Sequence, residues 1–253
     1  MSETGGNDSG GKQVVARAAA ILNALESEPR GMSLGRIAKA TDLPRTTVHR
    51  LVVSLEAQQL VASGSEGIRL GPALARLAAA AHVDVADIAR PFVESLGRRT
   101  RETVDLSVYR GRHAVSVDQF ASDQELRVVS PVGTAFPIHC TAHGKALLAA
   151  LSVTEAERVL NESPLEARTP ASVTDATALM RQLATIRQGG VAVDREEHAE
   201  GVCGLGIVLN TGATERYALS LAVPSQRFAR QQEKLEAALR QCAAEIESKL
   251  GMT

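Results

Sequence analysis

The chain has 253 residues, of which 44% are hydrophobic and 23% charged, and its formal net charge is -1. This length allows one large domain or two modest ones, each with a core, whereas the balanced charge excludes a surface that is basic throughout. Aromatic residues make up only 2% and tryptophan is absent, which argues against single-strand recognition by base stacking.

The apolar runs and the cysteines indicate where the protein works. The longest apolar runs fall well short of the roughly 20 residues that a membrane-spanning helix needs. Cys140, Cys203 and Cys242 lie far apart without a CxxC pair, and no secretory signal precedes them. We therefore expect reduced thiols in a cytoplasmic protein.

The N-terminal region is expected to begin without structure. Residues 1–12 are rich in Gly, Ser and Asn and are predicted to be disordered. Val14, Ala18, Ile21 and Leu25 then recur at helical spacing, and the helix is predicted to end at Pro29-Arg30-Gly31.

Two short helices follow, in helix-turn-helix organisation. Ser33 is a candidate N-cap for the first helix, which breaks at Asp42-Leu43-Pro44. The second helix has an apolar face, formed by Val48, Leu51, Val52 and Leu55.

The opposite face of the second helix carries groups that suit the major groove of DNA. Arginines, short hydroxyls and a histidine near a helix N-terminus can donate to guanine edges and phosphates. An ordinary helix pair with a solvated polar face is the alternative. The predicted DNA-contacting residues of the module are Ser33, Arg45, Thr46, Thr47, His49, Arg50 and Arg69.

A hairpin after the second helix favours the DNA-binding interpretation. Val61-Ala62 and Ile68-Arg69-Leu70 flank a Gly/Ser-rich turn, in the position of the wing of a winged helix. The segment from Arg30 to Arg69 also carries more basic than acidic residues, which suits a compact DNA-binding module. Residues 13–70 are therefore predicted to form a winged helix-turn-helix domain.

A linker helix is predicted over residues 71–82, since Pro72 suits a first helical turn. Leu70, Leu74, Leu77 and Ala81 recur at alternating spacings of four and three, as in a packed helix pair. This seam either packs on its own domain or joins two copies. We favour the second, because a dimer binds a palindrome more tightly and more specifically.

Residues 83–253 are predicted to form a second domain, of α+β class with an antiparallel sheet. Its first helix spans 86–99 and is expected to restart at Pro91, and a strand spans 103–109. The remaining strands are expected at 114–119, 126–130, 191–193, 205–210 and 218–223, and the remaining helices at 142–151, 154–161, 174–188 and 227–250.

Three stretches of the second domain could form a site. They are Phe136-Pro137-Ile138-His139-Cys140-Thr141-Ala142-His143-Gly144-Lys145-Ala146, the segment from Asp194 to Gly206, and Ser220-Leu221-Ala222-Val223-Pro224. In these stretches, and in its winged helix and its linker beginning Leu70-Gly71-Pro72, the chain resembles the IclR-type bacterial transcription regulators. The resemblance runs from about Val14 over nearly the full length.

The resemblance implies a GAF-like effector-binding domain and a homodimer or dimer of dimers. It also implies control of promoters for small-molecule catabolism, and we expect a repressor. Carried over position by position, the candidate effector-binding residues are Val128, Ala142, His143, Asp194, Gly204 and Ser220, with Cys203 beside Gly204.

Three positions depart from the family pattern. His143 stands where a small residue is frequent, Gly204 where a cysteine is expected, and Ala222 where a hydroxyl can occur. A histidine suits an aromatic acid or a hydroxylated ring. Separately, the helix N-terminus at 142–145 offers backbone N–H groups to an anion, so we predict an organic acid as effector.

Two other chemistries compete for the same residues. His139, Cys140 and His143, with Cys203 or His198, could hold zinc, and Cys140 with His143 could be the nucleophile and base of a hydrolase with an accessory N-terminal interaction module. His139 is expected to precede the helix, and no orienting third group is apparent. We therefore predict no bound metal, no cofactor and no catalytic activity. Glu196 and Glu197 are expected to lie in a solvated or ion-paired loop.

Overall fold

The computed structural model describes residues 8–80, 84–162 and 164–252. Contacts divide the chain into two units, with the boundary in the sequence between residues 83 and 84. None of the helices in the described ranges is long and apolar enough to cross a bilayer.

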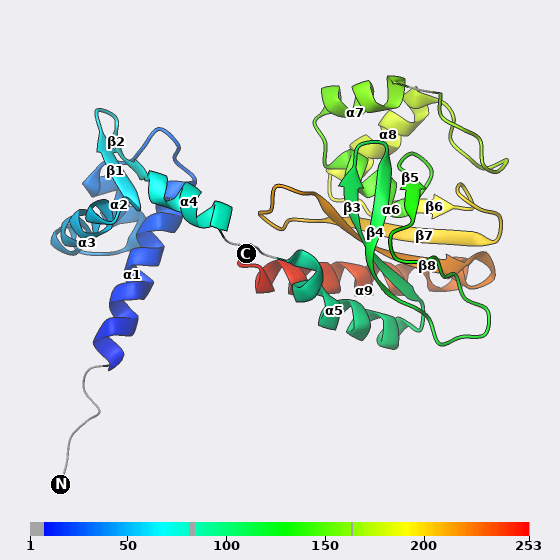
Figure 1. Cartoon of the computed structure of the whole chain (residues 1–253), viewed down its shortest axis with the longest axis horizontal. Coiled ribbons are helices and arrows are strands. Elements are labelled where there is room, and N and C mark those ends of the chain that lie inside the picture. The colour runs from blue at the N-terminus through cyan, green and yellow to red at the C-terminus, as the bar shows by residue number, and fades with distance from the viewer. Residues whose placement is uncertain (1–7, 81–83, 163, 253) are drawn as a thin grey trace, which may run out of the picture. The chain divides into compact units, whose positions relative to one another are not determined.

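The first unit is a winged helix-turn-helix domain (Figure 1). Its helices are α1 (Asp8–Glu26), α2 (Leu34–Thr41) and α3 (Arg45–Ala57), followed by the hairpin of β1 (Val61–Gly64) and β2 (Gly67–Leu70) and by α4 (Pro72–Ala80). The three helices and the hairpin share one core, which includes Ile21, Ile37, Val48 and Val61. An isolated bridge between Met32 and Ile68 joins the start of the helix-turn-helix to the hairpin.

The predicted disorder of residues 1–12 is wrong for its last part, because α1 begins at Asp8. Starting a helix is costly but extending it is cheap, so a helix anchored by Ile21 and Leu25 extends upstream into a Gly-containing stretch. The first seven residues of that prediction lie outside the described residues.

The predicted linker seam is only partly covered within this chain. Leu77 is 58% exposed and Leu70 38%, whereas Leu74 is half-buried and Ala81 lies outside the described residues.

The second unit is built on one antiparallel sheet of order β5-β4-β3-β8-β7-β6. The strands are β3 (Thr103–Arg110), β4 (His113–Phe120), β5 (Ala135–Pro137), β6 (Ala192–Arg195), β7 (Val202–Leu209) and β8 (Tyr217–Pro224). The α+β class with an antiparallel sheet is thus confirmed.

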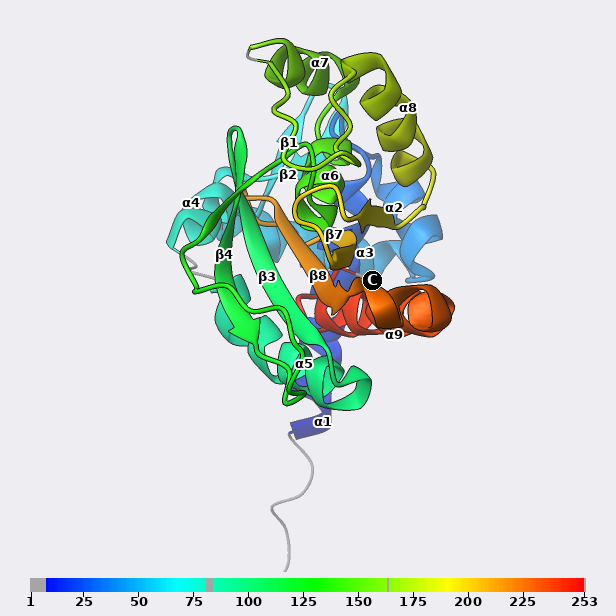
Figure 2. The same cartoon turned by 90° about the vertical axis from the view of Figure 1, so that its right-hand side faces the viewer.

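Helices cover both faces of this sheet (Figure 2). On one face, α5 (Val85–Thr100) and α9 (Ser225–Lys249) enclose a core with Val104, Leu106 and Leu205. On the other face, α6 (Ala142–Ala149) packs on the strands, and α7 (Val153–Asn161) and α8 (Ala176–Arg187) pack beside it.

Two local predictions for this unit are wrong. Residues 126–130 form a loop and not a strand. Their side chains do not alternate as in a strand, because Leu126 is exposed whereas Val128, two residues later, lines a pocket. The helix α5 also runs through Pro91 without restarting. The missing N–H of Pro91 frees the carbonyl of Asp87, and both residues are exposed, so water can satisfy that carbonyl.

Candidate functional site

The turn between α2 and α3 is fixed by local hydrogen bonds and backbone conformation. The Ser33 hydroxyl caps α2 by accepting from the Arg36 N–H at 3.3 Å. Asp42 ends α2 with a φ of 53°, and the Leu43 N–H donates back to the Ala38 carbonyl. Pro44 then begins α3 without a side-chain cap.

One face of α3 is buried and the other is free. Val48, Leu51, Val52 and Leu55 are buried as predicted, so the helix is held firmly on the domain. The predicted contact residues Arg45, Thr46, His49 and Arg50 are exposed and Thr47 is half-buried. Arg69 is exposed on β2, and Ser33 is exposed while it caps α2. The free face thus presents two guanidinium groups, an imidazole and a hydroxyl.

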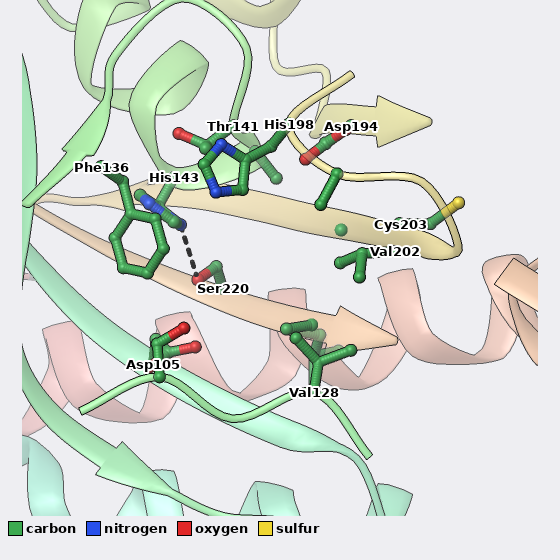
Figure 3. A pocket seen from close by; sticks show the side chains of 16 residues that line it. Asp105, Val128, Phe136, Thr141, His143, Asp194, His198, Val202, Cys203 and Ser220 are labelled. Carbon is green, nitrogen blue, oxygen red and sulfur yellow. Dashed lines mark hydrogen bonds between the residues drawn. The ribbon is translucent and has the colours of Figure 1, made fainter. Parts of the chain in front are cut away.

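A pocket of about 170 Å³ lies in the second unit (Figure 3). All of the effector-binding candidates named from the sequence line it: Val128, Ala142, His143, Asp194, Cys203, Gly204 and Ser220. The other lining residues were not singled out as effector contacts. Seven of them lie within the three stretches that the sequence pointed to, namely Phe136, Thr141, His198, Ala199, Val202, Leu221 and Ala222, whereas Asp105 and Ser130 lie outside those stretches.

The register of the sheet brings these residues together. Asp105 pairs with Ser220, and Ser220 pairs with Gly206. One step along the same face, Asp194 pairs with Gly204, and Gly204 pairs with Ala222. Because side chains alternate between the faces of a sheet, the two rows form the floor of the pocket beneath α6.

Glycines in β7 let the N-terminus of α6 approach this floor. A Cβ atom on Gly206 would lie 2.5 Å from the Ala142 carbonyl oxygen and 2.8 Å from the His143 nitrogen. A Cβ on Gly204 would meet the Ala142 side chain at 3.1 Å. Any larger residue at Gly206 must therefore push α6 away from the sheet.

The anion-binding capacity predicted for the start of α6 is partly used within the helix. The Gly144 N–H donates to the Thr141 hydroxyl and the Lys145 N–H to the Thr141 carbonyl. Of the first-turn amides at 142–145, the cap therefore leaves those of Ala142 and His143.

His143 is a buried, neutral imidazole. Its Nδ1 lies 3.4 Å from the Ser220 hydroxyl, and its ring meets the Phe136 ring edge-on at 4.9 Å. Burial, and to a smaller extent the neighbouring His198, lower the pKa of His143 to about 3. Its Nε2 is buried and has no hydrogen-bond partner among the described residues.

Two buried carboxyl groups face the pocket. Asp194 accepts from the Glu197 N–H at 2.8 Å, and burial raises its pKa to about 7. Asp105 accepts from the Gln119 side chain at 2.6 Å, and burial raises its pKa to about 6. A signal for Asp105 was present in the sequence, as a charged residue between Val104 and Leu106 in an otherwise buried strand.

The segment after Asp194 contains a buried ion pair behind the pocket. The Lys145 ammonium contacts Glu197 Oε1 at 2.5 Å and Gln182 Oε1 at 3.2 Å. The expected solvated or ion-paired loop is thus ion-paired at Glu197, while Glu196 accepts from the Gly201 N–H.

The structure does not assemble the competing catalytic or metal sites. Cys140 lies 3.9 Å from His198 and not beside His143, and burial raises the pKa of the Cys140 thiol to about 12. His139 precedes α6, as expected, and its Nε2 donates to the Glu166 carbonyl at 3.0 Å. Among the described residues, no three His, Cys, Asp or Glu side chains are grouped to hold a metal.

Comparison with family models and curated proteins gives consistent matches along the chain. A model described as bacterial transcriptional regulator IclR C-terminal matches residues 77–248, and one described as IclR helix-turn-helix domain matches residues 14–64. The HTH-type transcriptional regulator Rv1719 of Mycobacterium tuberculosis is 45% identical over 91% of this chain and 90% of its own length. TtgV of Pseudomonas putida, also named an HTH-type transcriptional regulator, is 40% identical over 96% of this chain and 93% of its own length.

A repressor and two solved structures extend these similarities. The HTH-type transcriptional repressor AllR of Escherichia coli is 30% identical over 96% of this chain and 92% of its own. An IclR transcriptional regulator from Silicibacter sp. superposes with a TM-score of 0.83 at 26% identity, over 95% of this chain and 96% of that one. An IclR homologue from Microbacterium hydrocarbonoxydans was solved in complex with 4-hydroxybenzoate. It superposes with a TM-score of 0.62 at 25% identity, over 95% of this chain and 100% of that one.

Proposed function

Because the chain belongs to the IclR family of bacterial transcription regulators, we propose that it represses a catabolic operon under the control of a small molecule. Like its curated relatives, it is a DNA-binding transcription regulator and not an enzyme. Repression is supported by the name of AllR, a repressor 30% identical to this chain. Its operator would lie on the bacterial chromosome, so the proposal places the protein in the cytoplasm.

The observation that carries the DNA-binding assignment is the division of α3 into a buried and a free face. Arg45, Thr46, Thr47, His49 and Arg50 would contact the bases and phosphates of a major groove, with the N-terminal half of α3 entering it. Arg69 on the hairpin would contact a neighbouring phosphate, and Ser33 would act near the backbone while it caps α2.

A homodimer, or a dimer of dimers, would bind a palindromic operator through two such helices. The exposed Leu77 of α4 and the exposed Leu70, at the end of β2 just before that helix, support a pairing surface there. Leu77→Lys should lower the mass measured by analytical ultracentrifugation, because it places a charge in an apolar contact. Val153→Lys alters a similarly exposed residue of α7, and its mass should not change. An unaltered mass for Leu77→Lys would remove α4 from the interface.

The effector is proposed to bind in the pocket between α6 and the sheet, through Val128, Ala142, His143, Asp194, Cys203, Gly204 and Ser220. A ligand changes DNA affinity only by binding one arrangement of the regulator better than another. The organic-acid prediction draws support from the first-turn amides of α6 and from the neighbour solved with 4-hydroxybenzoate. That neighbour also supports a hydroxylated ring, the other ligand feature that His143 suits.

The proposed function is tested by binding of the full chain to its own upstream DNA, titrated with small aliphatic and aromatic compounds at fixed salt. Salt is fixed because phosphate contacts make the affinity strongly salt-dependent. We expect tight binding that one compound weakens. Arg50→Ala should cost about 1–3 kcal/mol of binding free energy if Arg50 contacts a base.

A matched control separates base contact from the loss of a charge. Arg98→Ala removes an arginine from α5 in the other unit, and it should leave the DNA affinity unchanged. Equal affinities for wild type, Arg50→Ala and Arg98→Ala would rule out the role assigned to Arg50. Failure to bind any upstream fragment would count against the whole proposal.

A further inference from the structure

We propose that the pocket selects an uncharged single-ring aromatic molecule carrying hydroxyl groups and discriminates against the corresponding carboxylate anion. This replaces the organic acid of the proposed function with its other ligand feature, a hydroxylated ring, and it rests on the proposed function of a regulator controlled by a small molecule. Three properties of the pocket carry it: its volume, the sign of its charged groups, and the hydrogen-bonding capacity of its carboxyl groups and of His143.

The volume suits one aromatic ring. The cavity measures about 170 Å³, and an apolar protein cavity of about 150 Å³ accommodates benzene. Phe136, Val128 and Val202 supply apolar walls, and Figure 3 shows Phe136 and Val128 on different sides of the space. A ring with one or two small substituents would fill this cavity, whereas a fused bicyclic ligand would need the pocket to expand.

The charged groups repel an anion. Asp105 and Asp194 are the carboxyl groups in the lining, and no lysine or arginine lines the pocket among the described residues. The nearby ammonium of Lys145 is engaged by Glu197 and Gln182 behind the pocket. A ligand carboxylate would therefore sit close to two acidic groups without a cation, and like charges at short range disfavour each other's ionisation.

The two carboxyl groups of the lining can accept hydrogen bonds from a ligand. Asp105 accepts from Gln119 and Ser116 through Oδ1, Asp194 accepts from the backbone N–H groups of Glu197 and His198, and an ionised carboxylate has about four lone-pair sites in total. Both side chains thus retain capacity to accept hydrogen bonds from a ligand hydroxyl. Ser220 offers a hydroxyl between them along the sheet.

The imidazole of His143 adds a polar atom that a hydroxyl satisfies in either tautomer. Its Nε2 is buried and unpartnered among the described residues, and its Nδ1 is paired with Ser220. If Ser220 donates to Nδ1, then Nε2 carries a hydrogen and needs an acceptor. If Nδ1 donates to Ser220, then Nε2 needs a donor. A hydroxyl supplies both, whereas a carboxylate supplies only acceptors.

The experiment is isothermal titration calorimetry of the full chain with phenol, catechol, benzyl alcohol and benzoate at pH 7.5. Phenol is uncharged there, because a phenolic group has a pKa of about 10, and benzyl alcohol is close to benzoate in size. We expect at least one uncharged probe to bind about tenfold or more tightly than benzoate. Benzoate binding that equals or exceeds that of every uncharged probe overturns the proposal, and so does the absence of binding by all four.

Isosteric variants test the cause. Asp105→Asn and Asp194→Asn keep an oxygen for their existing protein donors but remove the charge. A hydrogen bond to a charged group is stronger than one to a neutral group by an amount equivalent to about five- to tenfold in affinity. The preference for the hydroxylated probe over benzoate should therefore shrink by about that factor in each variant.

Glu102→Gln is the matched control, because Glu102 is a buried carboxyl next to β3 that pairs with Arg227 and does not line the pocket. Its preference should equal that of wild type. If Asp105→Asn and Asp194→Asn also equal wild type, the assigned cause is wrong. Far-UV circular dichroism checks folding, and the wild-type comparison decides the ligand class even if one variant does not fold.

Operator binding by the same preparations distinguishes a wrong ligand class from a wrong proposed function. If the chain binds its operator while benzoate outcompetes the hydroxylated probes, the regulator stands and the ligand class is wrong. If the chain binds none of the upstream DNA, the proposed function itself fails, whatever the calorimetry reports.

Discussion

Lys145→Met should destabilise the second unit strongly, because it leaves a buried carboxylate without its cation. The Lys145 and Glu197 side chains are only 1% and 8% exposed, and their charged atoms are 2.5 Å apart. Glu197 Oε2 already has no partner among the described residues. Removing one member of a buried pair typically costs about 3–5 kcal/mol, and the high burial of both members places this pair in that class.

The double variant Lys145→Met/Glu197→Gln provides the decisive comparison. Replacing both charges removes the uncompensated carboxylate, so its free energy of unfolding should recover most of the loss. Urea unfolding followed by far-UV circular dichroism measures these differences, with hydrogen exchange of α6 assigning the transition to the second unit.

An exposed pair supplies the control for this experiment. Arg158 and Glu162 form an i,i+4 pair on the surface, and Arg158→Met should change the free energy of unfolding by less than about 1 kcal/mol. A cost for Lys145→Met as small as this, or a double variant no more stable than the single one, would refute the reasoning.

Three further outcomes are expected from urea unfolding. Gly206→Ala should destabilise the second unit by about 1–3 kcal/mol, because its Cβ would contact α6 backbone at 2.5 Å. Gly35→Ala, whose Cβ meets nothing within 4 Å in α2, should be neutral or stabilising by up to about 1 kcal/mol, and a similar loss in both variants would contradict the steric argument. Ser33→Ala should cost the first unit about 1 kcal/mol through loss of its cap, whereas no cost would mean that another group caps α2. Burial raises the pKa of Asp105 to about 6 and of Asp194 to about 7, from 3.8, so their contribution to stability is complete below pH 3.8 and is lost as the pH rises through 6 to 7. The free energy of unfolding should therefore decline less between pH 5 and 8 in Asp105→Asn and Asp194→Asn than in wild type, and unchanged slopes would exclude these carboxyls as the cause.

The loop of residues 126–130 shows why alternation alone misleads. Leu126 and Val128 are spaced in the sequence as in a strand, but Leu126 is exposed whereas Val128 lines the pocket, and none of the strands pairs with the loop. It is held instead by side chains from elsewhere, since Arg227 donates to the Leu126 carbonyl at 3.1 Å. That contact joins residues 101 positions apart, so no local window of sequence contains it.

The edge strand β5 was missed for a related reason. Ala135–Pro137 is a short strand that ends in proline, and it forms only because β4 offers an unpaired edge. Proline is tolerated at such an edge because no ladder donor is needed there.

The sequence by itself determined the helix-turn-helix and its free face, because these depend on interactions within a few residues. The spacing of Val48, Leu51, Val52 and Leu55 decides which side of α3 is buried, and Ser33 and Pro44 mark where the helices begin. The motifs from Pro137 to Lys145 and from Asp194 onward identified the family and most of the candidate pocket residues through resemblance.

Only the tertiary structure decided the chemical character of the pocket. Asp105 faces Ser220 because of the register between β3 and β8, and Asp194 faces Gly204 because of the register between β6 and β7. Strand register depends on the packing of whole sheet faces and not on neighbours in the chain. The sign of the charge around the ligand therefore emerges only when strands more than 80 residues apart come together, as β3 and β6 do on either side of β8 and β7.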